Sequence, residues 1–248
     1  AYNGQVSPAT SIIPAGLYGA DLDYHWQPSA DEEYPFDLDK AAEALDAAGY
    51  PLKNGARVDK HGKPVKLSLL SRAESTMSQT SGKFIAGWLK QLGIDVDYQV
   101  VSEAALSDRV WATVDGKPQP DYDMFLWGWV GDVDPNFLVS ILTSDQIGMW
   151  NQSAWANAEY DKLFAEQSRQ LDPQQRKEII WKMQRLVYDQ TPMIPLIYSR
   201  SQEAYDTANW TGWVKSPAKD GGGFYAFRTD AYLQVQPVGA DEPASRTG

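Results

Sequence analysis

Two carboxylates, Asp132 and Asp134, follow a run rich in tryptophan and glycine, Trp127-Gly128-Trp129-Val130-Gly131. A carboxylate beside an indole face suits a bound cation. An ammonium–carboxylate pair at about 4 Å is worth roughly 4 kcal/mol at an effective dielectric of 20, and the indole adds about 1–2 kcal/mol. The two glycines leave room beside the rings. The alternative is that the tryptophans fill the core and Asp132 is a loop residue. For Asp134, directly before Pro135, we favour a helix-capping role.

The same carboxylates make a poor catalytic pair. The acid and base of a glycosidase are distant in sequence and about 5–9 Å apart in space, whereas Asp132 and Asp134 are separated by one residue. The sequence has no glycine-rich phosphate loop and no G-x-S-x-G motif. It has no cysteine and only two histidines, His25 and His61, far apart. We therefore assign no catalytic and no metal-binding residue, and expect no cofactor.

The composition narrows the class of partner. The chain of 248 residues carries 22 Lys and Arg against 33 Asp and Glu, a net charge of −11. Such an acidic chain weighs against binding to nucleic acid or anionic lipid, both of which need a basic face. With 43% hydrophobic residues and 22% charged ones, the chain can bury a sizeable core. Its apolar stretches are far shorter than the roughly 20 residues of a membrane span.

The elements that would position these residues alternate between strands and helices, which predicts an α/β fold. Apolar–polar alternation predicts strands over residues 65–71, 94–101 and 121–129, which we place in one sheet, and a further strand over 192–199. Helical spacing and capping residues predict helices over 38–48, 81–92, 102–110, 135–142 and 157–170, and one that starts after Asp172. Three tryptophans on helix faces, Trp88, Trp111 and Trp181, are expected in the core, whereas Trp150 and Trp155 either line a pocket or cover the core.

Six segments, taken in this order, resemble one family: the extracellular solute-binding proteins of ABC transporters, in the class that takes up peptides, dipeptides and nickel. The segments are Tyr2-Asn3-Gly4-Gln5 with Pro8 and Ile13-Pro14; Tyr34-Pro35-Phe36-Asp37 through Ala48-Gly49-Tyr50; Leu92-Gly93-Ile94-Asp95-Val96; Tyr122-Asp123 through Gly128-Trp129 with Asp132 and Pro135; Asn157, Asp161-Lys162-Leu163, Asp172 and Arg176; and Pro192-Met193-Ile194-Pro195-Leu196. Each is weak alone, but together they cover most of residues 1 to about 235.

The resemblance implies a fold and a domain organisation. Members have two lobes that trap a ligand between them, so it implies one lobe of a clamshell, a mixed sheet flanked by helices. Residues 1–200 would form part of the second lobe, 201–238 would return toward the first lobe, and 239–248 are expected to be a disordered tail. We expect the first lobe and an export signal to precede Ala1. The chain alone would then hold half of the pocket.

The resemblance also implies a ligand site. In peptide-binding members an aspartate after the G-W strand pairs with the α-amino group of the peptide, and the matching residue is Asp132, with Trp129 as the matching ring. Trp127 lies on the same run, and Tyr198 matches a tyrosine-rich strand that lines the cleft, although Ser199 and Arg200 replace further aromatics. The implied function is capture of an oligopeptide or dipeptide and delivery to a membrane permease outside the cell. An oligosaccharide receptor is the alternative within the family, and a carboxylate-dependent hydrolase the alternative outside it.

Overall fold

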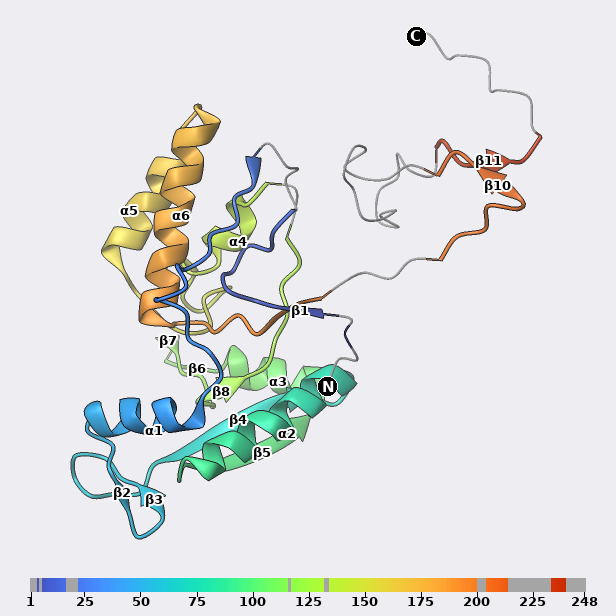
Figure 1. Ribbon diagram of the computed structural model, residues 1–248. Helices are drawn as coiled ribbons and strands as arrows, with labels where there is room; N and C mark the ends of the chain where they lie inside the picture. Colours follow the sequence, from blue (N-terminus) through green and yellow to red (C-terminus); the bar gives the residue numbers. More distant parts are fainter. Residues whose placement is uncertain are drawn as a thin grey trace.

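The computed structural model in Figure 1 describes residues 4, 6–16, 22–115, 117–131, 134–199, 204–213 and 233–239. Strands and helices alternate within these ranges, so the α/β class is confirmed. The strands are β1 Val6–Pro8, β2 Leu52–Lys53, β3 Ala56–Arg57, β4 Lys66–Arg72, β5 Asp95–Val101, β6 Thr113–Val114, β7 Lys117–Pro118, β8 Met124–Phe125, β9 Ile197–Ser199, β10 Trp210–Thr211 and β11 Gln236–Pro237. The helices are α1 Leu38–Ala47, α2 Thr76–Gln91, α3 Glu103–Val110, α4 Asn136–Ser140, α5 Ala158–Gln167 and α6 Pro173–Gln190, with a 3₁₀ turn Ser144–Gln146.

The three strands predicted to share a sheet do so, in the order β5-β4-β8, and both pairings are parallel. The central strand β4 is covered on both faces, since the neighbouring residues Leu69 and Leu70 are both buried. Leu70 packs with Leu106 and Val110 of α3. On the other face, Gly82 of α2 lies so close to Ser71 and Tyr98 that a Cβ there would be 2.4 Å from each side chain. Helices α2 and α3 therefore cover opposite faces, as Figure 1 shows.

The expectation of a mixed sheet needs a correction. Among the described residues the three-stranded sheet is wholly parallel, and antiparallel pairing occurs in separate two-stranded sheets: β1 with β9, β2 with β3, β6 with β7, and β10 with β11. The parallel arrangement follows from the helices that connect successive strands, since each crossover returns the chain in the same direction. The antiparallel pair β1–β9 instead joins the start of the chain, Val6–Pro8, to the distant segment Ile197–Ser199.

Two predicted strands are shorter than the sequence pattern indicated. Only Met124–Phe125 of the predicted strand 121–129 forms a strand. This strand, β8, pairs with a single neighbour, β4. The last hydrogen bond between them runs from the Leu126 amide to the Leu70 carbonyl at 3.0 Å. Only Ile197–Ser199 of 192–199 forms a strand. Pro192 and Pro195 have no N–H to donate, and the partner β1 has three residues.

The helix starts follow the predicted capping residues. Asp37, Ser102 and Asp172, the predicted caps, each accept a hydrogen bond from a backbone N–H of the first turn of α1, α3 and α6, and Asn157 does the same for α5. Helix α2 begins at Thr76, earlier than predicted, because Ser75 caps it and its first turn is polar. Helix α5 ends at Gln167, short of the predicted residue 170. Among the described residues no helix combines the length and apolar character of a membrane span.

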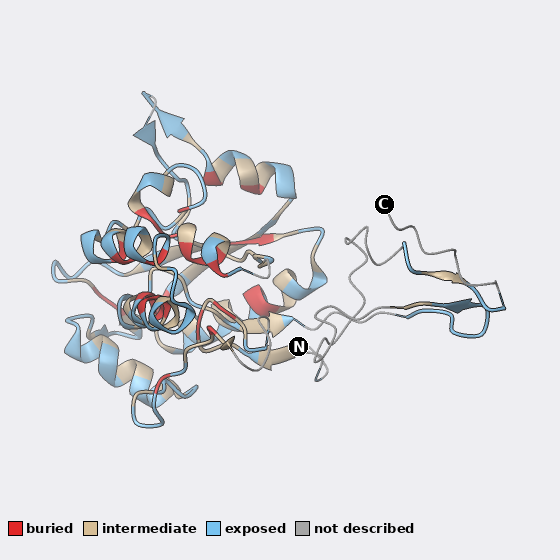
Figure 2. Cartoon of the chain, turned by 90° about the horizontal axis from the view of Figure 1, so that it is seen from above, coloured by how far each residue is buried: buried red, intermediate tan, exposed pale blue. Residues whose placement is uncertain are grey.

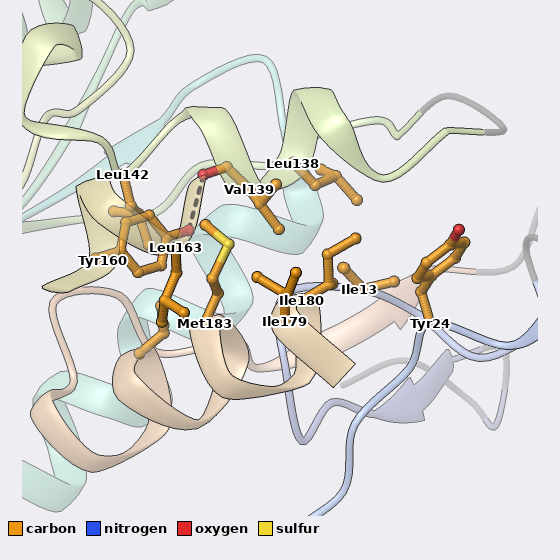
Figure 3. Close-up of a cluster of buried hydrophobic side chains, with 11 residues drawn as sticks. Ile13, Tyr24, Leu138, Val139, Leu142, Tyr160, Leu163, Ile179, Ile180 and Met183 are labelled. Carbon is orange, nitrogen blue, oxygen red and sulfur yellow. Dashed lines mark hydrogen bonds between the residues drawn. The ribbon is translucent and has the colours of Figure 1, made fainter. Parts of the chain in front are cut away.

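A second region is built around the helices α4, α5 and α6. Its core brings together residues of these helices with Ile13 and Tyr24 from the start of the chain, as Figure 3 shows. Tyr160 is fully buried, and its hydroxyl donates to the Val139 carbonyl at 2.8 Å. Burial raises the pKa of Tyr160 far above its ordinary value, so it stays a neutral donor. Figure 2 shows the buried residues gathered between helices whose outer faces are exposed.

Candidate functional site

The parallel strands β4, β5 and β8 end at one edge of the sheet, which we call the carboxyl edge. In open α/β sheets, ligands bind outside this edge. Three chain segments meet there: Arg72 ends β4, Glu103 begins α3 directly after β5, and Trp127 follows β8 by two residues. The sheet therefore places a cation, a carboxylate and an indole ring together.

The contact between Arg72 and Trp127 defines this edge. The guanidinium carbon of Arg72 lies 4.6 Å from the centre of the Trp127 ring, a cation–π geometry, and its Nη1 donates to Glu103 Oε2 at 3.2 Å. The Nε of Arg72 is buried and has no hydrogen-bond partner. Sequence reasoning missed Arg72, although a basic residue directly after the predicted strand 65–71 was a usable signal.

Trp129 continues the aromatic surface away from the sheet. Its ring lies edge-on to three others: 6.5 Å from Trp127, 5.7 Å from Trp150 and 5.9 Å from Phe137. Both site tryptophans are partly exposed, and Trp150 remains 43% exposed. Of the two uses left open for Trp150 and Trp155, the surface use fits Trp150. Trp155 instead packs against the buried Tyr160, 5.1 Å away.

The two glycines of the run differ. A Cβ at Gly128 would meet nothing within 4 Å, so this position does leave open space beside the indoles. A Cβ at Gly131 would lie 2.7 Å from Leu138 Cδ1, so this glycine permits close packing against α4 and leaves no room for a ligand. The open side of the aromatic surface is therefore at Gly128, beside the 85% exposed Val130.

Asp132, the residue predicted to meet the ligand, lies outside the described residues. The prediction that Asp134 caps the helix is wrong by one residue, since the N-cap of α4 is Pro135; Asp134 lies just before it, and its Oδ1 accepts from the Asn136 amide at 2.8 Å. It also pairs with Arg176 of α6 through two hydrogen bonds of 2.7 and 2.8 Å. Hydrogen bonding to the Arg176 guanidinium holds the pKa of Asp134 below its ordinary value.

Tyr198 uses its hydroxyl within the chain. The Ser11 amide donates to it at 3.0 Å, and it donates to the Ser11 carbonyl at 2.8 Å. Its ring lies edge-on to His25 at 5.9 Å. These contacts hold β9 against the segment after β1. The ring contacts of Trp129 are with other residues, namely Trp127, Phe137 and Trp150. A ligand role for Tyr198 stays a prediction and would use the ring.

Two tryptophans expected in the core are exposed instead. Trp88 is 36% exposed and stacks with Phe84 on the outer side of α2, and Trp111 is 40% exposed. Trp111 borders a small pocket, with room for about one water molecule, that is lined by Leu106, Ser107, Val110, Trp111, Phe125, Trp127 and Gln152. In the described part of the chain, no three acidic or histidine side chains are grouped so as to hold a metal ion.

Comparison with known proteins identifies the family. Residues 1–149 match the middle region of the bacterial extracellular solute-binding proteins, family 5. Heme-binding protein A of Haemophilus influenzae is 28% identical over 200 residues, which are 80% of this chain and 33% of that protein. The chain thus spans about a third of this relative.

Solved structures have the same fold. A periplasmic oligopeptide-binding protein of Thermotoga maritima with bound mannohexaose superimposes with a TM-score of 0.71 at 20% identity, over 96% of this chain and 46% of that one. DppA of Helicobacter pylori in complex with the peptide STSA superimposes with a TM-score of 0.66 at 21% identity, over 95% and 40%. The six sequence segments, the carboxyl edge and the family match agree, and the chain belongs to the family 5 bacterial extracellular solute-binding proteins.

Proposed function

We propose that this chain is the second lobe of a receptor that captures an oligopeptide or dipeptide and delivers it to the permease of an ABC importer. The observation that carries the proposal is the carboxyl edge, where Arg72 lies over Trp127 and the ring of Trp129 continues the aromatic surface. A peptide has a cationic amino end, an anionic carboxyl end and an apolar body. Asp132, Arg72 and the indoles offer a complement to each.

Each group has a distinct role in this proposal. Asp132 would accept hydrogen bonds from the α-amino group, while the Arg72 guanidinium would donate to an anionic group of the solute. Arg72 is suited to this because its ring contact and its pairing with Glu103 hold the head group in place. Trp127 and Trp129 would bury the apolar part of the ligand. Tyr198 would contribute through its ring.

The rest of the pocket would come from a first lobe outside this chain, which spans 33–46% of the relatives described above. An export signal in that longer protein would place the receptor outside the cytoplasmic membrane. We expect the isolated chain to fold but to bind peptide weakly, with a Kd above the micromolar range, because its aromatic surface has only one side of the cleft. Calorimetry of the isolated chain that gave micromolar or tighter peptide binding would contradict this.

The experiment that tests the proposal is a calorimetric titration of the longer receptor with a free tripeptide, its N-acetylated form and a cello-oligosaccharide. We expect tight binding of the free peptide. In Asp132→Asn, the affinity for the free peptide should fall by about 2–5 kcal/mol, at least tenfold, with little change for the acetylated one. An equal loss for both ligands, or none, would remove Asp132 as the amino-end contact.

The titration with the oligosaccharide distinguishes a peptide-binding function of the aromatic surface from a sugar-binding one. Indole faces also stack on sugar rings, and the Thermotoga maritima neighbour holds mannohexaose. Tight binding of the oligosaccharide together with indifference to both peptides would assign the site to a sugar and reject the peptide proposal.

A further inference from the structure

The exposed ring of Trp150 lies directly beside the candidate site. It remains 43% exposed, and it meets the rings of Trp129 and Phe137 edge-on at 5.7 and 6.4 Å. Both of these rings pack against the core of the helical region, so Trp150 rests on a firm base. The segments that carry the two indoles also expose the apolar side chains of Val130, at 85%, and Met149, at 58%. The apolar surface of the candidate site therefore extends from Trp129 to Trp150.

The backbone that carries Trp150 is held firmly in place. The next residue, Asn151, is 1% exposed, and its Nδ2 donates to the carbonyls of Thr143 and Trp155 at 3.0 and 2.8 Å. The Asn151 amide also donates to the Gln146 carbonyl at 2.9 Å. Displacing a buried amide side chain with these partners is costly, because its polar atoms would lose their hydrogen bonds. The position of the Trp150 ring is therefore preorganised.

Two side chains of the sheet region hold the same segment from the other side. Trp111 Nε1 donates to the Met149 carbonyl at 2.9 Å, and the Tyr122 hydroxyl donates to the Gln152 carbonyl at 2.5 Å. Burial raises the pKa of Tyr122 to about 12, so this hydroxyl remains a donor at neutral pH. The backbone is thus fixed both before and after Trp150, and the segment joins the two regions of the molecule beside the candidate site.

The chemistry around this ring is neutral and apolar. Segments 124–131 and 147–156 contain no charged residue, although 22% of the whole chain is charged. An ionic group of a ligand would therefore find no counter-ion on them. The side chains of Asn151 and Ser153 are hydrogen-bonded within the chain, so they do not serve the hydroxyls of a sugar. A preorganised, exposed indole in such surroundings matches a large apolar side chain, and an aromatic one best, because aromatic pairs gain from edge-to-face contact.

We propose that Trp150 is a specificity-determining residue, whose exposed ring forms with Trp129 the binding surface for an aromatic side chain of the ligand. This inference rests on the proposed function, in which the ligand is a peptide, and adds to it a preference among peptides. Trp150 lies outside the six segments that carry the family resemblance, so that resemblance assigns it no role.

The experiment measures a preference between peptides rather than affinity alone. In the longer receptor, calorimetry gives Kd for trialanine and for the three tripeptides in which one alanine is replaced by phenylalanine. We expect wild type to bind at least one of these three roughly tenfold more tightly than trialanine. In Trp150→Ala this preference should shrink by roughly five- to tenfold, while Kd for trialanine changes by less than about twofold. Trp150→Leu keeps an apolar side chain against Phe137 and provides the same test if the alanine variant does not fold.

The matched control is Trp88→Ala. Trp88 is also partly exposed, at 36%, and stacks with Phe84 on the outer side of α2, so its loss should leave the preference unchanged. If a folded Trp150 variant keeps the wild-type preference, or weakens all four peptides by the same factor, the inference fails while the proposed function stands. The same holds if wild type binds trialanine as tightly as the phenylalanine peptides. If wild type binds none of the four peptides, the proposed function fails and the inference with it.

Discussion

The two regions of the molecule differ in the size of their buried hydrophobic clusters. The helical region has one core cluster of eleven buried residues, from Ile13 to Val187. The sheet region has a cluster of three, Leu70, Leu106 and Val110, completed by partly buried residues that include Trp127. The candidate site lies on the sheet region and is joined to the helical region through Trp129, which packs against the larger cluster. A rigid helical base thus positions a ligand surface whose own aromatic groups stay partly exposed.

The largest expected effect is on stability and tests the core of the helical region. Ile180 is fully buried among residues of α5 and α6. Ile180→Ala removes methyl groups and leaves a cavity, so we expect the free energy of unfolding to fall by about 2–5 kcal/mol, measured by urea denaturation. Leu171→Ala is the control, because Leu171 is 93% exposed and should change stability by no more than about 0.5 kcal/mol. Similar losses in the two variants would contradict the assigned core.

The packing of the sheet region is tested at the contact between α2 and the sheet. A methyl group at Gly82 would overlap Ser71 and the Tyr98 ring, so Gly82→Ala should destabilise the chain by about 1–3 kcal/mol. Gly87 is on the same helix with nothing within 4 Å of its Cβ position. Gly87→Ala should therefore stabilise the chain by about 0.5–1 kcal/mol. Thermal unfolding of both variants provides the test, and a stabilised Gly82→Ala would show that α2 does not pack as described.

Sequence reasoning was most successful where the cause is local. Capping side chains reach only two or three residues, so Asp37, Ser102 and Asp172 could be assigned from the sequence alone. Strand ends were harder, because the extent of β8 depends on how far β4 runs beside it. The prediction for residues 121–129 correctly placed the aromatic run at the end of the strand, although it made the strand too long.

The parts of the site that escaped prediction depend on distant residues. Arg176 belonged to a recognised motif, yet its pairing with Asp134 spans 42 residues and follows from how α4 docks on α5 and α6. Arg72 comes to lie over Trp127 only because β4 and β8 are neighbours. The exposure of Trp88 has a similar origin: its position on α2 fits an apolar stripe, but α2 contacts the sheet through the side that carries Gly82.

An intermediate effect is expected at the carboxyl edge itself. If the two regions contribute the two ends of the ligand site, Arg72→Gln in the longer receptor should weaken binding of a peptide with a free carboxylate by roughly tenfold and spare the peptide amide. Asp132→Asn should show the opposite preference, sensitive to the amino end. Titration of the free and amidated peptides against both variants checks this, and an equal loss for both peptides in Arg72→Gln would leave Arg72 a structural residue held by Glu103.

The smallest effect concerns how the start of the chain is held to the helical region. Glu32 accepts from the Ser29 hydroxyl at 2.6 Å and pairs with Arg185 of α6, and these contacts lower its pKa from 4.5 to about 2. A carboxylate with a lowered folded-state pKa adds stability above its unfolded pKa and loses it as the pH falls through the folded value. Glu32→Gln should therefore be slightly less stable than wild type at pH 7. The difference should shrink between about pH 4.5 and 2, where wild-type Glu32 becomes protonated and neutral like glutamine. Urea unfolding of both proteins at pH 7, 4.5, 3 and 2 measures the difference directly. A difference that stayed constant over this range would mean that the ionised carboxylate of Glu32 is not what holds this segment to α6.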